Sequence, residues 1–242
     1  MSRLTQIVCA ASGILFVFVL FGGIIAAGWI PPIAPSKSAA EVARYYQAHA
    51  NGIRTMAVMV MFGAGLTIPF AGLMATHVRR MEGPFAPLFA VNLIAGAAGA
   101  VAIFMPAMLL GAAAYRPERS PQVTQALNDL AWVPFIMNGP PAIAQAVSFG
   151  LAVLGDKSER PAFPRWLGFY NFWVAFCFLP ACILVYFKHG PFAWNGLLSF
   201  WLAATVFGTY FIIMAVMFIK AARVVEGERE PSAGRAADLV AA

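Results

Sequence analysis

The chain alternates between long apolar runs without charge and short polar connections. Six runs contain no Asp, Glu, Lys or Arg: 4–36, 55–78, 83–115, 130–155, 166–187 and 189–219. Each exceeds the ~20 residues that an α-helix needs to cross the hydrocarbon core of a bilayer. Because a spanning segment must satisfy its own backbone hydrogen bonds, and the runs lack the alternation of barrel strands, each run is predicted to be helical.

This pattern predicts an all-α, polytopic membrane protein with six transmembrane helices. We place the helices near 7–30, 54–76, 86–114, 129–154, 166–187 and 194–221. The composition agrees, because 61% of the 242 residues are hydrophobic and 11% are charged, which excludes a soluble domain. Residues 1–222 are predicted to form one transmembrane domain, and residues 223–242 a polar, disordered cytoplasmic tail.

The net charge of +6 reflects membrane topology rather than binding of nucleic acid, because the lysines and arginines flank the apolar runs. With the amino terminus inside, ten of the 16 lysines and arginines lie on the cytoplasmic side. The positive-inside rule therefore predicts that both termini are cytoplasmic. No nucleic acid is expected as a partner.

The connection after the first helix carries a helix-start signal. Ser38 and Glu41 have the spacing of a capping box, in which each side chain bonds the backbone of the other residue. The sequence therefore predicts a short interfacial helix over about 38–51, ending near Asn51-Gly52.

The fourth helix contains the motif Asn138-Gly139-Pro140-Pro141 near its middle. Two adjacent prolines remove two amide donors and clash with earlier carbonyls, so the helix is predicted to break there. The carbonyls of Ile136 and Met137 then need other partners. Broken helices of this kind form substrate sites in transporters, and the alternative is an ordinary proline kink.

Neutral polar residues are the remaining polar groups inside the predicted helices. A cavity lined by Asn92, Asn138, Gln145 and Asn171, with aromatic walls from helices five and six, would suit an apolar ligand with a polar end. The alternative is that these amides bond between helices as packing contacts. No charged residue lies at a helix centre, which argues against an ion-coupled or proton-coupled pump.

A polar stripe runs along the start of the fourth helix, from Gln122 through Asp129 to Trp132. Asp129 is predicted either to form a salt bridge with Arg116 or Arg119, closing the loop, or to be a binding carboxylate at the mouth of a cavity.

Cofactor and enzyme signals are weak. The three cysteines lie inside apolar runs without a C-x-x-C spacing, and the three histidines lack metal spacing, so neither a cofactor nor a metal is expected. No hydrolase or metalloprotease motif is present. An enzyme would have to use an outer-surface site, with Asp129 beside His49 or His189.

The most distinctive segments are Pro164–Trp173 (P-R-W-L-G-F-Y-N-F-W) and Phe187–Gly196 (F-K-H-G-P-F-A-W-N-G), together with Arg116–Arg119 (R-P-E-R) and Leu127–Trp132 (L-N-D-L-A-W). At these residues the chain resembles an uncharacterised bacterial family of six-helix integral membrane proteins. The resemblance covers helices one to six and implies a multi-pass protein of the bacterial cytoplasmic (inner) membrane. It implies no activity, and it directs attention to the outer end of helix four and to the hairpin between helices five and six.

Three functions follow from these features. The first is binding or carriage of a small, largely apolar molecule in a cavity beside broken helix four, at Asn92, Asp129, Trp132, Asn138, Pro140, Pro141, Gln145 and Asn171. The second is an accessory subunit that docks through small-residue stripes at Gly96 and Gly99, as a homo-oligomer or on a partner membrane subunit. The third is the outer-surface enzyme. Membrane lipids are partners in all three.

Overall fold

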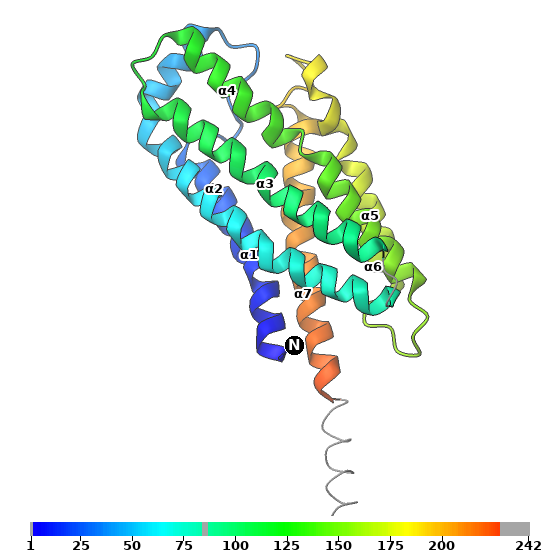
Figure 1. Cartoon of the computed structure of the whole chain (residues 1–242). Helices are drawn as coiled ribbons and strands as arrows, with labels where there is room; N and C mark the ends of the chain where they lie inside the picture. The colour runs from blue at the N-terminus through cyan, green and yellow to red at the C-terminus, as the bar shows by residue number, and fades with distance from the viewer. Residues whose placement is uncertain (1, 84–86, 228–242) are drawn as a thin grey trace, which may run out of the picture.

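The computed structural model describes residues 2–83 and 87–227, and this part of the chain is helical throughout (Figure 1). The elements are α1 (Arg3–Ala26), α2 (Ala39–Glu82), α3 (Pro87–Tyr115), α4 (Pro121–Ile136), α5 (Gly139–Gly155), α6 (Arg165–Cys177), the 3₁₀ helix η1 (Leu179–Tyr186), the π-helical turn η2 (Leu197–Leu202) and α7 (Ala203–Gly227). Most of the predicted tail, residues 223–242, lies outside the described residues. Its first five residues, 223–227, belong to α7 instead.

Five helical segments of the described residues are long and apolar enough to cross a membrane. They are α1, α2, α3, α6 continued by η1, and η2 continued by α7. The all-α class is therefore confirmed for the described residues, and five segments are compatible with a multi-pass membrane protein. The predicted fourth helix is two shorter elements, because α4 ends at Ile136 and α5 begins at Gly139.

The start of α2 corrects the prediction of a separate interfacial helix. The capping box is present, since Glu41 N donates to Ser38 Oγ and Ser38 N donates to Glu41 Oε2 at 2.9 Å. The helix does not end at Asn51-Gly52, however. It bends at His49, the one residue inside α2 with non-helical dihedral angles, and continues to Glu82. Gly52 lies inside this helix and allows the end of α1 to approach it closely, because an added Cβ would collide with the Ala26 carbonyl oxygen.

Close packing of α2 against α1 and α3, and of α7 against α1, builds the core. Phe211 of α7 is at its centre, with ring centroids 5.0 Å from Phe16 and 4.8 Å from Phe70. Gly63 allows α1 and α2 to approach, because an added Cβ would lie 3.3 Å from the Phe16 ring. Large apolar side chains such as Phe62 point outward, where a bilayer would cover them.

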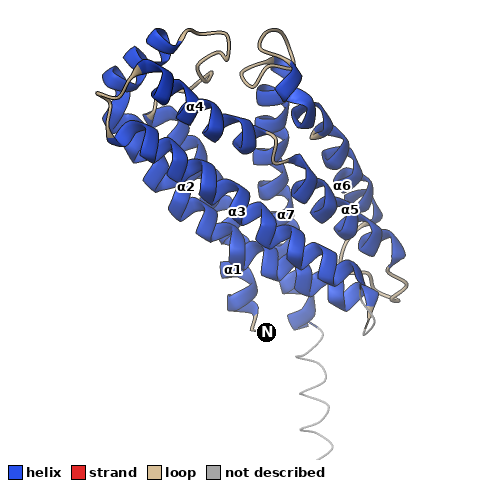
Figure 2. Cartoon of the chain, turned by 45° about the horizontal axis from the view of Figure 1, so that its top comes forward, coloured by secondary structure: helices blue, strands red, loops and turns tan. Residues whose placement is uncertain are grey.

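Residues 27–52 and 116–136 form a polar-aromatic cap at one end of the bundle, where α4 lies against the first turns of α2 (Figures 1 and 2). Tyr46 donates to Asn128 Oδ1 at 3.1 Å, and both residues are fully buried. Gln125 Nε2 donates to the Lys37 carbonyl at 3.0 Å. These bonds tie the loop before α2 to α4, so the cap holds the start of α4 in place.

Candidate functional site

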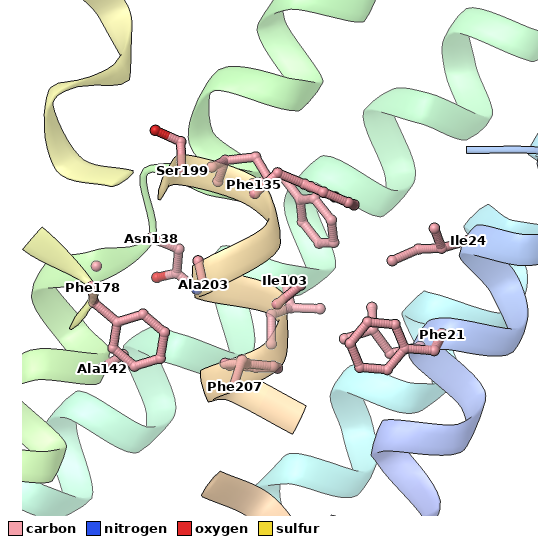
Figure 3. A pocket seen from close by; sticks show the side chains of 15 residues that line it. Phe21, Ile24, Ile103, Phe135, Asn138, Ala142, Phe178, Ser199, Ala203 and Phe207 are labelled. Carbon is pink, nitrogen blue, oxygen red and sulfur yellow. The ribbon is translucent and has the colours of Figure 1, made fainter. Parts of the chain in front are cut away.

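A cavity of about 100 Å³ lies beside the junction of α4 and α5 (Figure 3). Its wall is mainly aliphatic and aromatic. It is lined by Leu20, Phe21, Ile24, Ile103, Phe135, Ile136, Asn138, Gly139, Ala142, Phe178, Ser199, Phe200, Ala203, Ala204 and Phe207. We call it the first cavity.

Three interruptions of regular α-helix meet at the first cavity. The junction between α4 and α5 contributes Asn138, the passage from α6 to the 3₁₀ helix contributes Phe178, and the change from π to α geometry lies at Ala203. In Figure 3 these residues come from three separate elements around one space. Local 3₁₀ and π geometry inside helices is frequently found at functional sites.

A second cavity, of about 40 Å³, adjoins the first on the side of α2 and α3. Ile103, Asn138, Ala142, Phe178 and Phe207 line both cavities, so they form the partition between them. The rest of the second wall consists of Thr67, Phe70, Ala71, Ala95, Gly96, Gly99, Ala100, Gln145, Tyr210 and Phe211. The two cavities are therefore neighbours that share one wall.

Three hydroxyl groups in the walls are already used within the protein. Thr67 and Ser199 donate to main-chain oxygens at 2.6 Å and 2.8 Å, and Tyr210 donates to a methionine sulfur at 3.7 Å. Of the three, only the Tyr210 bond joins two helices, α7 and α2. Their donors are therefore not free to bind a ligand.

Two amide groups in the walls are different. Asn138 Oδ1 and Gln145 Nε2 are buried, and neither has a hydrogen-bond partner among the described residues. A buried polar group without a partner costs roughly 1–3 kcal/mol, so it needs an explanation, and a bound water or ligand is one. Seven other buried side-chain atoms of the described residues are also unpaired, but only these two belong to residues of the cavity walls that have no other side-chain hydrogen bond. The walls contain no Asp, Glu, Lys, Arg or His.

The other two predicted amides do not line either cavity. Asn92 is fully buried, and its Nδ2 donates to the Gln145 carbonyl and to Ser148 Oγ, both at 3.0 Å. Asn171 is also fully buried and donates to the Leu167 carbonyl at 2.8 Å. For these two residues the alternative of packing contacts describes the structure, and the four-amide lining is corrected to two.

Trp132, Pro140 and Pro141 are also outside the cavity walls. Trp132 is fully buried in the cap, with its ring centroid 5.0 Å from that of Trp29 in an edge-on contact. The prolines occupy the first turn of α5, where helix N–H groups have no intrahelical partner, so their missing donors cost nothing. The Met137 carbonyl, predicted to need a partner, accepts from Gly139 N at 2.7 Å.

Asp129 lies in the cap and does not form the predicted salt bridge. Asn128 Nδ2 donates to its carboxylate at 3.1 Å, whereas Arg119 donates to the Ala112 carbonyl at 2.8 Å. Burial raises the pKa of the Asp129 carboxyl above its ordinary value, although the bond from Asn128 and the charge of Lys188 act in the opposite direction. The loop between α3 and α4 is thus closed by the hydrogen bond from Arg119 to a backbone oxygen instead of a salt bridge.

Asp129 and His49, two of the residues predicted for an outer-surface enzyme, make other contacts. His49 Nδ1 lies 3.0 Å from the Tyr45 carbonyl, and its ring stacks on the Tyr45 ring at 4.1 Å. The charged group found to influence Asp129 is Lys188 rather than a histidine. Among the residues that the structure describes, no group of three or more His, Cys, Asp or Glu could hold a metal ion.

The small-residue stripe of α3 faces the interior instead of a partner. An added Cβ at Gly96 would lie 2.6 Å from Ala71 Cβ and 2.7 Å from Gln145 Nε2. Gly99 lines the second cavity. Gly96 is therefore used for packing within the chain, whereas an added Cβ at Gly99 would meet nothing within 4 Å.

Sequence reasoning missed the aromatic partition residues Phe178 and Phe207. Pro180, two residues after Phe178, was a signal, because a proline interrupts regular helical hydrogen bonding and the chain is 3₁₀ from Leu179. The π-helical turn before Ala203 has no comparable mark in the sequence.

No protein-family model, curated protein or solved structure matches the chain. Any inference of function therefore rests on the geometry of the two cavities.

Proposed function

We propose that this chain is a six-span protein of the bacterial cytoplasmic membrane that binds or carries a small, largely apolar molecule in the two cavities. The observation that carries the proposal is the convergence of three interrupted helices on one apolar space. Broken helices at such a place are how membrane proteins build substrate sites.

The sixth span in this proposal is α4 together with α5. Arg3 and the described end of α7 lie at the same end of the bundle in Figure 1, which requires an even number of crossings. Five candidate spans leave one crossing to assign, and α4 and α5 are the remaining helices. At 1.5 Å per residue the pair is about 50 Å long, so the first turns of α4 would project beyond a ~30 Å core.

The distribution of charge supports the orientation. In the proposed topology the cap faces outward, and ten of the 16 lysines and arginines face the cytoplasm, five of them at the two termini. The cap would then stand over the outer end of the first cavity. A ligand would reach the cavity from the outer side or from lipid beside α4 and α5.

The volume of the two cavities limits the size of the ligand. An apolar cavity of ~150 Å³ in an engineered protein core accommodates benzene. The first cavity, at about 100 Å³, with its smaller neighbour of about 40 Å³, is of the same order. A single ring or a short chain fits this space without a change of the surrounding helices.

Native mass spectrometry of the protein purified in mild detergent tests the proposal. The wild type is compared with Ala203→Leu, which fills the first cavity, and with Ala98→Leu, which makes the same change on an exposed face of α3. We expect a discrete small adduct in the wild type and in Ala98→Leu, and its loss in Ala203→Leu.

Two results would contradict the proposal. An adduct retained in Ala203→Leu would place the ligand elsewhere. A wild-type chain carrying only heterogeneous phospholipid, or arriving bound to another subunit, would favour the accessory-subunit function.

A further inference from the structure

We infer that the ligand is uncharged and has a polar end that both donates and accepts hydrogen bonds, which Asn138 and Gln145 recognise. This inference rests on the proposed function and specifies the class of ligand. A hydroxyl, a primary amide or a protonated acid has the required chemistry, and the rest of the molecule is apolar.

The two free amide atoms match such a group. Asn138 presents an oxygen acceptor and Gln145 a nitrogen donor, and both are buried without a partner among the described residues. Rotation of either amide about its last bond exchanges oxygen and nitrogen, so each position offers one donor and one acceptor. A group with both functions can satisfy the two amides together.

Their positions give the ligand a direction. Asn138 lies in the partition and reaches both cavities, whereas Gln145, two helical turns further along α5, lines only the second. The first cavity has the larger volume and the phenylalanine rings of α1 and α4, Phe21 and Phe135. The apolar body therefore fits the first cavity, with the polar end directed through the partition toward Gln145.

The surroundings hold Gln145 in place for this contact. Its main-chain carbonyl accepts from Asn92 Nδ2 at 3.0 Å and from Ser148 Oγ at 2.9 Å, which fixes the backbone across α3 and α5. Opposite the amide is Gly96, where an added Cβ would lie 2.7 Å from Gln145 Nε2. The glycine leaves room that the amide occupies.

A charged ligand does not fit the walls. An anion would need positive groups, yet the walls contain no basic residue, and Pro140 and Pro141 remove two of the amide donors that make a helix N-terminus attractive to anions. A cation would meet aromatic faces and amide groups, but no acidic residue that could balance its charge. Burying an unpaired charge costs several kcal/mol.

The test uses five probes that share a phenyl ring and differ in the attached group: toluene, benzyl alcohol, benzamide, benzoate and benzylammonium. Dissociation constants are measured by ligand-observed NMR titration of the detergent-solubilised protein. The variants are Gln145→Met, which keeps the length of the side chain but removes its polar atoms, and Asn138→Leu. Gln122→Met is the matched control, because Gln122 is exposed on α4, away from both cavities.

We expect the wild type to bind benzamide at least about 100-fold more tightly than benzoate or benzylammonium. Gln145→Met should weaken benzyl alcohol and benzamide about 10-fold, the effect of one lost hydrogen bond, and leave toluene unchanged. Gln122→Met should behave as the wild type.

The outcomes separate this inference from the proposed function. Three results would overturn the inference while leaving the cavity as a binding site. The variants could lose affinity for toluene and benzamide equally, or Gln145→Met and Asn138→Leu could both keep the wild-type affinity for these probes. The third result is tight binding of a charged probe by the wild type. Failure of every probe to bind the wild type would count against the proposed function itself. The comparison of charged and neutral probes on the wild type decides the question of charge even if a variant fails to fold.

Discussion

Gly139 lies where η1 approaches the start of α5, and its replacement by alanine tests how the cavity wall is assembled. An added Cβ would collide with Cys182 Sγ and lie 3.4 Å from the Phe178 carbonyl oxygen. The backbone of Gly139 is not left-handed, so alanine can adopt its conformation without strain. The expected effect is therefore the steric contact alone.

The magnitude follows from two opposing contributions. Overpacking by one methyl group typically costs ~1–3 kcal/mol. Replacing glycine by alanine also reduces the entropy of the unfolded chain, which returns ~0.4–1 kcal/mol. We expect Gly139→Ala to lower the free energy of unfolding by about 1–2 kcal/mol, measured by denaturant titration in mixed micelles with far-UV circular dichroism.

A double-mutant cycle identifies the contact. In the Cys182→Ala background the colliding sulfur is gone, so Gly139→Ala should be neutral or slightly stabilising, giving a coupling energy of about 1–2 kcal/mol. Gly65→Ala is the control, because an added Cβ there meets nothing within 4 Å. An equal cost of Gly139→Ala with and without Cys182 would refute the reasoning.

Two further predictions concern groups that the structure places outside the cavities. Asn92→Leu removes two hydrogen bonds between α3 and α5 and should lower the free energy of unfolding by about 1–2 kcal/mol in the same titration, whereas an unchanged value would contradict the packing role. Asp129 has a raised pKa in the folded protein, so the stability that it contributes is complete below its unfolded pKa of about 4 and is lost as the pH rises through the folded pKa. The wild type should thus lose stability relative to Asp129→Asn between pH 4 and 7, and parallel pH profiles of the two proteins would exclude this effect.

Features that depend only on residues close in sequence could be predicted from the sequence. The capping box at Ser38 and Glu41 needs only local backbone geometry, and it is present. By contrast, α4 begins at Pro121, ahead of the predicted start at 129, where the first helical turn tolerates the proline. The end of the predicted interfacial helix was wrong, because a glycine such as Gly52 can equally serve close packing between helices inside a longer helix.

Candidate site residues were harder to assign, because the chemistry of an amide does not reveal what it faces. Asn92, Asn138, Gln145 and Asn171 looked equivalent in sequence. All four keep one buried amide atom without a partner among the described residues, but Asn92 and Asn171 donate within the protein and line neither cavity, whereas Asn138 and Gln145 belong to the cavity walls. The difference arises from the rotation of each helix about its axis.

The sequence by itself determined that the chain is helical and suited to a membrane, because the length of an apolar run and the backbone's need for internal hydrogen bonds are local constraints. Only the tertiary structure decided where the cavities lie and which side chains line them. Phe178, at the end of α6, and Phe207, in α7, have ring centroids 6.3 Å apart in the wall that both cavities share. That contact depends on how helices distant in sequence pack together, which the local sequence does not encode.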